Sequence, residues 1–319
     1  MGPRGSPAQV RLPHIEPMLA TAGPLPRGSG WRGEVKWDGA RCLAYIPGAA
    51  PVRLLGRGGT DYTLRFPEVA RALTEVQGPL ILDGELVVMR GGVPSFAALQ
   101  GRIHRTRPQA VQAGAAAAPA LFVAFDLLHT GQHSLLTEPY ARRRDLLDGL
   151  ALEQPGLRVP PTWDSVAEAF GWTREHSLEG VIAKRLDSVD RPNTRSRNWV
   201  KIKHLRVADV VIGGWLPGGP GGASVRAVLV GAPLETGGPL LFVGSVSSGM
   251  TGPERRALAA ALRRLAVPVS PFTAGSGGLG LPRGTEVRFT RPELLAEVEF
   301  LELTDAGRLR QPVWRGLRS

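Results

Sequence analysis

One lysine in this sequence has surroundings that suit a nucleophile. Lys36 stands in the run EVKWDGAR, residues 34–41, at the end of a predicted strand and just before a glycine turn and a second strand. A lysine that attacks phosphorus must be deprotonated, and a free lysine, with a pKa of about 10.4, is not. Neighbouring cations and a bound metal can depress that pKa. The run is also compatible with an ordinary surface hairpin, so it needs support from other segments.

Two carboxylates lie where short apolar strands are predicted. Glu85 lies in LDGEL, residues 82–86, and Glu179 begins EGVIAK, residues 179–184. Carboxylates that converge from two strands would form a site for a hard divalent cation shared with phosphate oxygens, and Mg²⁺ and Mn²⁺ both suit oxygen ligands. The alternative is a simple turn at Asp83, with Glu85 as a solvated edge residue.

Two lysines alternate in a further predicted strand. In WVKIK, residues 199–203, Lys201 and Lys203 share one face of the strand while the apolar residues between them face the other side. Two ammonium groups side by side repel each other, an arrangement that makes sense if both face a triphosphate. The alternative is a basic, solvated edge strand.

Taken in order, these segments resemble the signature motifs of the covalent nucleotidyltransferases, the superfamily of ATP-dependent DNA ligases, RNA ligases and mRNA-capping enzymes. Residues 36–39 resemble the nucleotidyl-lysine motif, and Arg41 its trailing arginine. The other matched segments are residues 56–59 (a Ser-Arg-x-Gly-like element with Gly56 where serine is usual), 83–85, 125–128, 179–181 and 201–203.

The two ends of the sequence resemble the ligase branch. Residues 17–20 and 309–318 are similar to bacterial end-joining-type minimal ligases. The resemblance implies an ATP-dependent DNA ligase that seals nicks or breaks with 3′-hydroxyl and 5′-phosphate ends, in DNA repair. Lys36 would attack the α-phosphorus of ATP, hold AMP and pass it to the 5′-phosphate, where the 3′-hydroxyl displaces it. An RNA ligase or a capping-type nucleotidyltransferase remains an alternative at this point.

The resemblance also implies roles for individual residues. ATP and a divalent metal are the expected cofactors. The assignments are Lys36 as nucleophile, Glu34 and Val35 on the adenine side, Phe125 stacked on the base, Arg41 and Arg57 on ribose, phosphate or the 5′-phosphate of the nick, Glu85 on the ribose hydroxyls or a metal, Glu179 on a metal, and Lys201 and Lys203 on the α-phosphate. Arg318 fits the arginine of the family's last motif, and Ser319 follows it without that motif's Asp and Lys. We therefore expect slow self-adenylation that an appended Asp-Lys tail improves.

The expected fold class is α+β. A nucleotidyltransferase domain with ATP-grasp-like antiparallel sheets and helices would be followed by an OB-fold β-barrel. The expected divisions are an N-terminal arm at 1–30, an adenylation domain at 31–204 and an OB-fold domain at 205–319. The pattern predicts three strands, a helix and two strands in the last part, the element order of an OB-fold: 207–216, 225–231, 240–246, 253–266, 286–289 and 296–303. Helices in the first part are predicted at 68–76, 140–150 and 165–175, the last capped by Asp164, while 105–119 stays open between loop and irregular helix.

The charge balance favours a polyanionic partner. Lys and Arg number 39 against 28 acidic residues, a formal net charge of +11. We expect nicked or broken double-stranded DNA as the partner, together with end-joining repair proteins, no membrane, and a monomer. One cysteine, Cys42, rules out an internal disulfide and suits the cytoplasm, where we expect association with the nucleoid. From another class of protein, a non-catalytic basic nucleic-acid-binding OB module remains an alternative, but it requires Lys36 to be dispensable.

Overall fold

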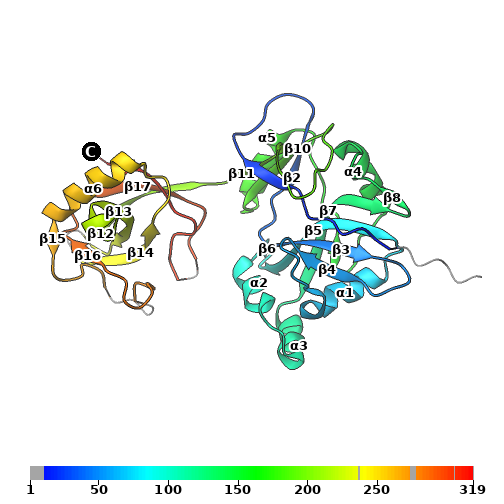
Figure 1. Ribbon diagram of the computed structural model, residues 1–319, viewed down its shortest axis with the longest axis horizontal. Helices are drawn as coiled ribbons and strands as arrows, with labels where there is room; N and C mark the ends of the chain where they lie inside the picture. The colour runs from blue at the N-terminus through cyan, green and yellow to red at the C-terminus, as the bar shows by residue number, and fades with distance from the viewer. Residues whose placement is uncertain (1–10, 236–237, 274–277, 305, 319) are drawn as a thin grey trace, which may run out of the picture. The chain divides into compact units, whose positions relative to one another are not determined.

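The protein divides into two compact units, Met1–His204 and Leu205–Ser319 (Figure 1). The computed structural model describes residues 11–235, 238–273, 278–304 and 306–318. Each unit contains its own cluster of buried apolar side chains, the largest in the first unit around Leu82 and Phe122, and the largest in the second around Ile212 and Trp215. Each unit can therefore be described by itself.

Two mainly antiparallel sheets form the first unit. One has the strand order β1-β11-β10-β2, and the other β4-β3-β5-β7-β8, with β6 and β9 attached to β5 and β7. Their bounds are β1 Leu19–Ala22, β2 Trp31–Val35, β3 Ala40–Ile46, β4 Arg53–Gly56, β5 Leu80–Arg90, β6 Val93–Pro94, β7 Ala120–Thr130, β8 His133–Ser134, β9 Leu157–Arg158, β10 Gly180–Arg185 and β11 Arg195–Lys203.

Helices pack against both sheets. α5 packs on β2 and β10, while α1, α2 and α4 contact the strands of the larger sheet (Figure 1). The bounds are η1 Thr63–Arg65, α1 Pro67–Thr74, α2 Phe96–Ile103, α3 Pro108–Ala117, α4 Tyr140–Gly149 and α5 Val166–Glu175. Ala169 of α5 is fully buried and lies so close to Gly33 of β2 that a Cβ at Gly33 would come 2.6 Å from its side chain. The helix thus fixes the strand that precedes Lys36.

The structure differs from, or adds to, the helix and arm predictions at four places. Ser165 caps α5 by accepting a hydrogen bond from the backbone of Glu168, whereas the predicted cap, Asp164, pairs with Arg32. Helix α2 was not predicted; Ser95 caps it. The undecided segment 105–119 contains α3. In addition, part of the expected N-terminal arm forms β1, which pairs in parallel with β11.

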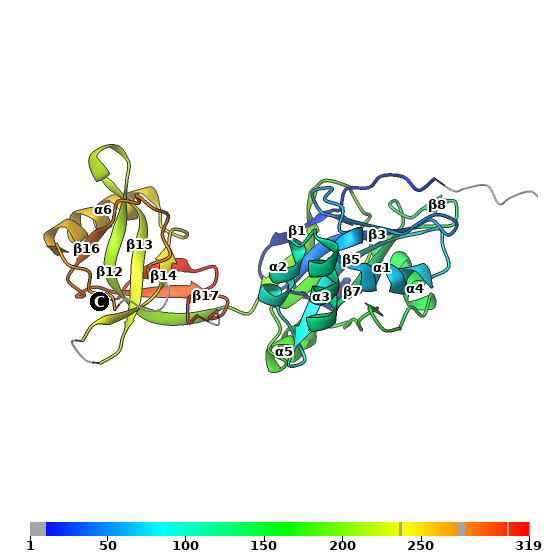
Figure 2. The same ribbon diagram turned by 90° about the horizontal axis from the view of Figure 1, so that it is seen from below.

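The second unit contains a bent antiparallel sheet and one long helix. β12 pairs with β13, β16 and β17, and β18 pairs with β17. α6 lies beside β12 and β13 (Figure 2), and a Thr251–Glu254 capping box starts it. The bounds are β12 Arg206–Gly218, η2 Pro220–Gly222, β13 Ser224–Pro233, β14 Leu240–Val246, α6 Gly252–Arg264, β15 Ala266–Val267, β16 Arg288–Thr290, β17 Leu295–Phe300 and β18 Val313–Leu317.

The predicted order of three strands, a helix and two strands is observed in this unit, with the short β15 and the C-terminal β18 in addition. β18 was not predicted from the sequence. Only Trp314 of its five residues is buried, so it shows little of the alternation between buried and exposed residues that marks a strand. Among the described residues, no helix has the length and apolar character needed to cross a membrane.

Candidate active site

A pocket between the two sheets of the first unit gathers most of the predicted site residues. The smaller sheet forms one wall of the pocket through β2, β10 and β11. The larger sheet forms the opposite wall through β3, β5 and β7. The predicted residues that line it are Glu34, Val35, Lys36, Arg41, Arg57, Glu85, Phe125 and Lys201. Glu179 and Lys203 are not among its lining residues; Glu179 joins the site by pairing with Lys36, and Lys203 by pairing with Glu179.

Strand register places the smaller sheet's side chains on one face. Ile182 of β10 lies between Glu34 of β2 and Lys201 of β11, and Lys184 lies opposite Trp199. Side chains two residues apart on a strand point to the same side. Glu34, Ile182 and Lys201 therefore form one row of the pocket wall, with Lys184 and Trp199 in the next.

Lys36 directly follows β2, and its backbone N–H donates to the carbonyl oxygen of Gly180, 2.9 Å away. Its Nζ lies 2.5 Å from Oε2 of Glu179, while Oε1 of the same carboxylate lies 2.7 Å from Nζ of Lys203. The Glu179 side chain is only 6% exposed. One largely buried carboxylate thus holds two ammonium groups side by side at the edge of the pocket.

The turn after Lys36 is pressed against β5. A Cβ at Gly39 would collide with the carbonyl oxygen of Leu86 and with the side chain of Glu85. Only glycine permits this approach. The close contact brings the end of β2 to the strand that carries Glu85.

Glu85 and Lys201 have perturbed acidities. Burial raises the pKa of Glu85 to about 8, with Asp83 and Glu179 adding to the rise and Arg41 and Lys36 opposing it. Burial also lowers the pKa of Lys201, and the neighbouring ammonium groups of Lys203 and Lys36 lower it further. Perturbed acidities of this kind are concentrated where charges are gathered for chemistry.

Arg41 pairs with the acid that the sequence places inside an apolar strand. Its Nε and Nη2 donate to the two oxygens of Asp83, each at 2.5 Å, and Asp83 is fully buried. The simple-turn alternative for Asp83 is wrong, because the residue lies in the middle of β5. The guanidinium also lies 4.5 Å from the centroid of the Phe125 ring. Arg41 is therefore fixed in the pocket wall by a bidentate pair.

A β-bulge directs Phe125 into the pocket. Asp83 of β5 pairs with Asp126 of β7, but the next residue, Gly84, pairs with Ala124, so Phe125 is an extra residue between them. A bulge of this kind turns one side chain away from the regular alternation. Arg57, in contrast, lies in the exposed loop after β4, where its guanidinium remains accessible to a ligand.

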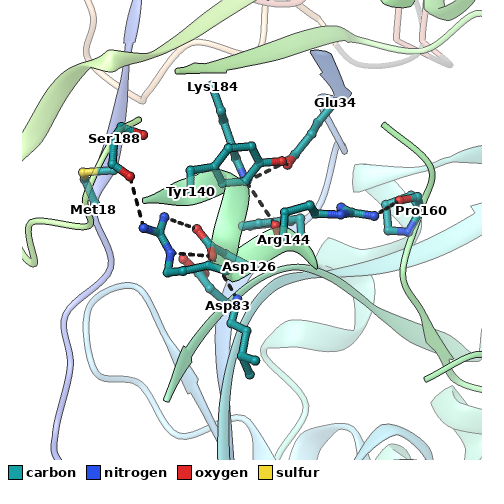
Figure 3. Close-up of polar contacts among 12 residues, drawn as sticks. Met18, Glu34, Asp83, Asp126, Tyr140, Arg144, Pro160, Lys184 and Ser188 are labelled. Carbon is teal, nitrogen blue, oxygen red and sulfur yellow. Dashed lines mark hydrogen bonds and ion pairs between the residues drawn. The ribbon is translucent and has the colours of Figure 1, made fainter. Parts of the chain in front are cut away.

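Sequence reasoning missed several residues of the site. Lys184 is 1% exposed and lies 2.8 Å from Oε2 of Glu34, and Tyr140 donates a hydrogen bond to the other oxygen of Glu34 (Figure 3). The two-residue alternation along β10 and β11 could have identified Lys184 and Trp199, because it puts them on the same strand faces as Ile182 and Lys201. The sequence around Tyr140 contains no comparable pattern. The other lining residues that were not predicted are Leu19, Ala20, Trp37, Ile182 and Arg195.

Within the part of the chain that the structure describes, no three His, Cys, Asp or Glu side chains are grouped so that they could hold a metal ion by themselves. Magnesium is commonly held by one or two carboxylates together with substrate phosphates. A metal at this pocket would therefore need oxygens from the substrate.

Two family models together match most of the chain. Residues 17–203 match the ATP dependent DNA ligase domain, and residues 221–319 match the ATP dependent DNA ligase C terminal region. The multifunctional non-homologous end joining DNA repair protein LigD of Mycobacterium tuberculosis (strain ATCC 25618 / H37Rv) is 40% identical over 312 residues, which cover 96% of this chain and 38% of LigD. The chain thus spans less than half the length of that relative.

A second relative is similar over most of both chains. DNA ligase C2 of Mycolicibacterium smegmatis is 33% identical, and the match covers 91% of this chain and 86% of the relative. Among solved structures, the ligase domain of Mycobacterium tuberculosis LigD is 38% identical, with a TM-score of 0.54 over 95% of each chain. A Lig E DNA ligase structure, at 16% identity and a TM-score of 0.62, shares the fold. The predicted fold class is thereby confirmed, and the chain belongs to the ATP-dependent DNA ligase family.

Proposed function

We propose that this enzyme seals 3′-hydroxyl and 5′-phosphate ends at nicks or breaks in double-stranded DNA by carrying AMP on Lys36. The observation that carries the proposal is the position of Lys36 at the pocket edge, 2.5 Å from Glu179 and beside Lys203. We further propose that the first unit is the adenylation domain and that the second is the OB-fold domain. Family membership supports the DNA ligase activity over the RNA ligase, capping and non-catalytic alternatives.

The first step would be the attack of Lys36 on the α-phosphorus of ATP. The new N–P bond replaces the bond to pyrophosphate, which leaves, and the attacking neutral amine loses one proton to solvent, so that the phosphoramide nitrogen keeps one. Because an ammonium has no lone pair, an amine held beside Glu179 would have to lose a proton before it attacks. Lys201 and Lys203 would bind the α-phosphate, where positive charges stabilise the charge of the phosphoryl group in transfer.

The remaining pocket residues would bind the nucleoside. Glu34 and Val35 would line the adenine side, and Phe125 would contribute a stacking surface for the base. Glu85 would contact the ribose hydroxyls, and Arg41 and Arg57 the ribose, a phosphate or the 5′-phosphate of the nick. Arg57 is the exposed member of this pair, which suits it to the DNA end.

Glu85 and Glu179 are the residues that would hold a divalent metal, Mg²⁺ or Mn²⁺. The half-buried carboxyl of Glu85, whose pKa is raised to about 8, fits a cation because a nearby positive charge favours its ionised form. Both oxygens of Glu179 contact ammonium groups in this structure, so Glu179 would have to exchange a partner. A bound metal supplies neutralisation of charge on phosphate oxygens.

We also propose a biological setting. The similarity to LigD supports work in end joining, with repair proteins as partners, and the net charge of +11 supports contact with DNA in the cytoplasmic nucleoid. A monomer would suffice, because the pocket is formed within one unit.

The test is nucleotide labelling followed by sealing. The protein is incubated with labelled ATP or labelled GTP and then offered nicked DNA or nicked RNA. The proposal predicts ATP labelling and DNA sealing, both lost in Lys36→Ala, while DNA binding by that variant persists. GTP labelling, or DNA sealing by Lys36→Ala, would refute it.

A further inference from the structure

Lys184 and Glu34 form an ion pair that is almost completely removed from water (Figure 3). Nζ of Lys184 lies 2.8 Å from Oε2 of Glu34, and the two side chains are 1% and 3% exposed. Tyr140, at the start of α4 and fully buried, donates its hydroxyl to Oε1 of Glu34. Burying an ion pair costs about as much in desolvation as the attraction returns, so apolar residues could hold these elements together equally well. Stability alone does not account for this pair.

The ammonium of Lys184 also connects the walls of the pocket. It donates to the carbonyl oxygen of Phe125 at 3.2 Å, and it lies 4.2 Å from the ring centroid of Trp199, 4.6 Å from that of Phe125 and 4.8 Å from that of Tyr140. Ring faces attract cations at these distances. The charge of Lys184 therefore has a fixed position behind Glu34.

The carboxylate of Glu34 keeps further hydrogen-bonding capacity. Each carboxylate oxygen has about two acceptor sites and no donor, and Lys184 and Tyr140 use one on each oxygen. Glu34 itself lines the pocket. Adenine presents a 6-amino donor, whereas 6-oxopurines present an acceptor at the same place. A carboxylate held in a fixed position would accept a hydrogen bond from the 6-amino group of adenine and would repel the 6-oxo oxygen of a 6-oxopurine.

Building on the proposed use of ATP, we propose that Lys184, together with Tyr140, is a positioning residue that sets the base specificity of the pocket. The two residues hold Glu34 as an oriented carboxylate, which selects a 6-aminopurine and rejects a 6-oxopurine. When the ammonium is removed, Oε2 of Glu34 loses the partner that fixes it. A carboxyl group that can turn no longer keeps an acceptor facing the 6-position of the base, so it discriminates less against the 6-oxo oxygen.

The experiment compares single-turnover labelling of Lys36 by ATP and by inosine triphosphate, which differs in the 6-oxo group. The wild type should strongly prefer ATP. Lys184→Met should lower the ATP-to-inosine preference by about tenfold to a hundredfold, the range for one hydrogen bond to a charged group. Lys184→Arg keeps the charge and should retain most of the preference. Arg185→Met, the matched control at the next, exposed position, should leave both rates unchanged.

Three outcomes decide the matter. If folded Lys184→Met, checked by circular dichroism, loses ATP and inosine labelling in equal proportion, its role is structural and the proposal is overturned. If that variant does not fold, Tyr140→Phe and Glu34→Gln carry the test: each should lower the preference, and an unchanged preference in both overturns the proposal. If the wild type takes label from neither nucleotide, the proposed function fails first.

Discussion

The Nζ of Lys36 and Oε2 of Glu179 are 2.5 Å apart, although 143 residues separate them in the sequence. β2 ends just before Lys36, β10 begins just after Glu179, and the two strands are antiparallel neighbours. The pairing of these strands therefore positions the amine. Any loss of this carboxylate should affect the first chemical step before it affects DNA binding.

Glu179→Gln should slow the labelling of Lys36 by ATP by about tenfold or more, because a charge-assisted hydrogen bond that orients the amine is lost. Single-turnover label transfer measures this rate. Glu175→Gln changes an exposed glutamate four residues earlier and serves as the control. Equal rates in Glu179→Gln and the wild type would show that the carboxylate does not position Lys36.

Asp83→Ala should destabilise the first unit by about 1–3 kcal/mol, because it leaves Arg41, whose side chain is 20% exposed, without its bidentate partner. Urea unfolding, followed by the fluorescence of the tryptophans of the first unit, measures the loss. Asp187→Asn, which breaks the exposed pair with Arg185, is the control and should unfold with the wild type. A wild-type midpoint for Asp83→Ala would contradict this account of the buried pair.

The titration of Asp190 should lower the free energy of unfolding of the protein as the pH rises. Its carboxyl is 5% exposed, and neither oxygen has a hydrogen-bond partner among the described residues. Burial, with Asp126 and Asp83 adding and Arg143 and Arg41 opposing, raises its pKa to about 7. The folded protein therefore keeps a proton that the unfolded chain releases near its ordinary pKa of about 3.9. Stability contributed by this group is complete below about pH 4 and is lost through about pH 7.

Asp190→Asn removes this titration. The difference in melting temperature between Asp190→Asn and the wild type should shift in favour of the variant between about pH 4 and pH 8. Differential scanning calorimetry at several pH values measures it. Parallel curves for the two proteins across this range would exclude the shifted carboxyl.

Gly56→Ser should destabilise the protein, even though serine is the usual residue at this position of the family motif that residues 56–59 resemble. A Cβ at Gly56 would lie 2.5 Å from Cε2 of Tyr62, whose ring packs edge-on against the buried Phe66. Overpacking of this kind costs about 1–3 kcal/mol. Gly58→Ser, where a Cβ would meet nothing within 4 Å, is the matched control. Identical thermal unfolding of both variants would contradict the steric explanation.

The sequence was sufficient for features that depend on local pattern. The alternation of Lys201 and Lys203 predicted their shared face, and the order of the motifs predicted which segments meet Lys36. Lys201 lines the pocket, and Lys203 shares Glu179 with Lys36. The shared face follows from the two-residue period of a strand, which needs no tertiary information, whereas the meeting of the motif segments at Lys36 is what the resemblance to the nucleotidyltransferases implies.

Features that depend on contacts between distant segments could not be predicted from the sequence pattern. The partner of Asp83, Arg41, is on another strand, and only the β3–β5 register brings the two together. The bulge at Phe125 depends on a shift between β5 and β7. Tyr140 reaches Glu34 from the start of a helix, 106 residues along the chain. No period or motif in either segment reports such a contact.

The most direct test of the account is a peptide mass map of the protein after incubation with ATP and a divalent metal. The account predicts one added AMP, on the peptide that contains Lys36, and none in Lys36→Arg, which keeps the positive charge but supplies no lysine amine. An unmodified wild-type protein, or an adenylate that persists in Lys36→Arg, would contradict it.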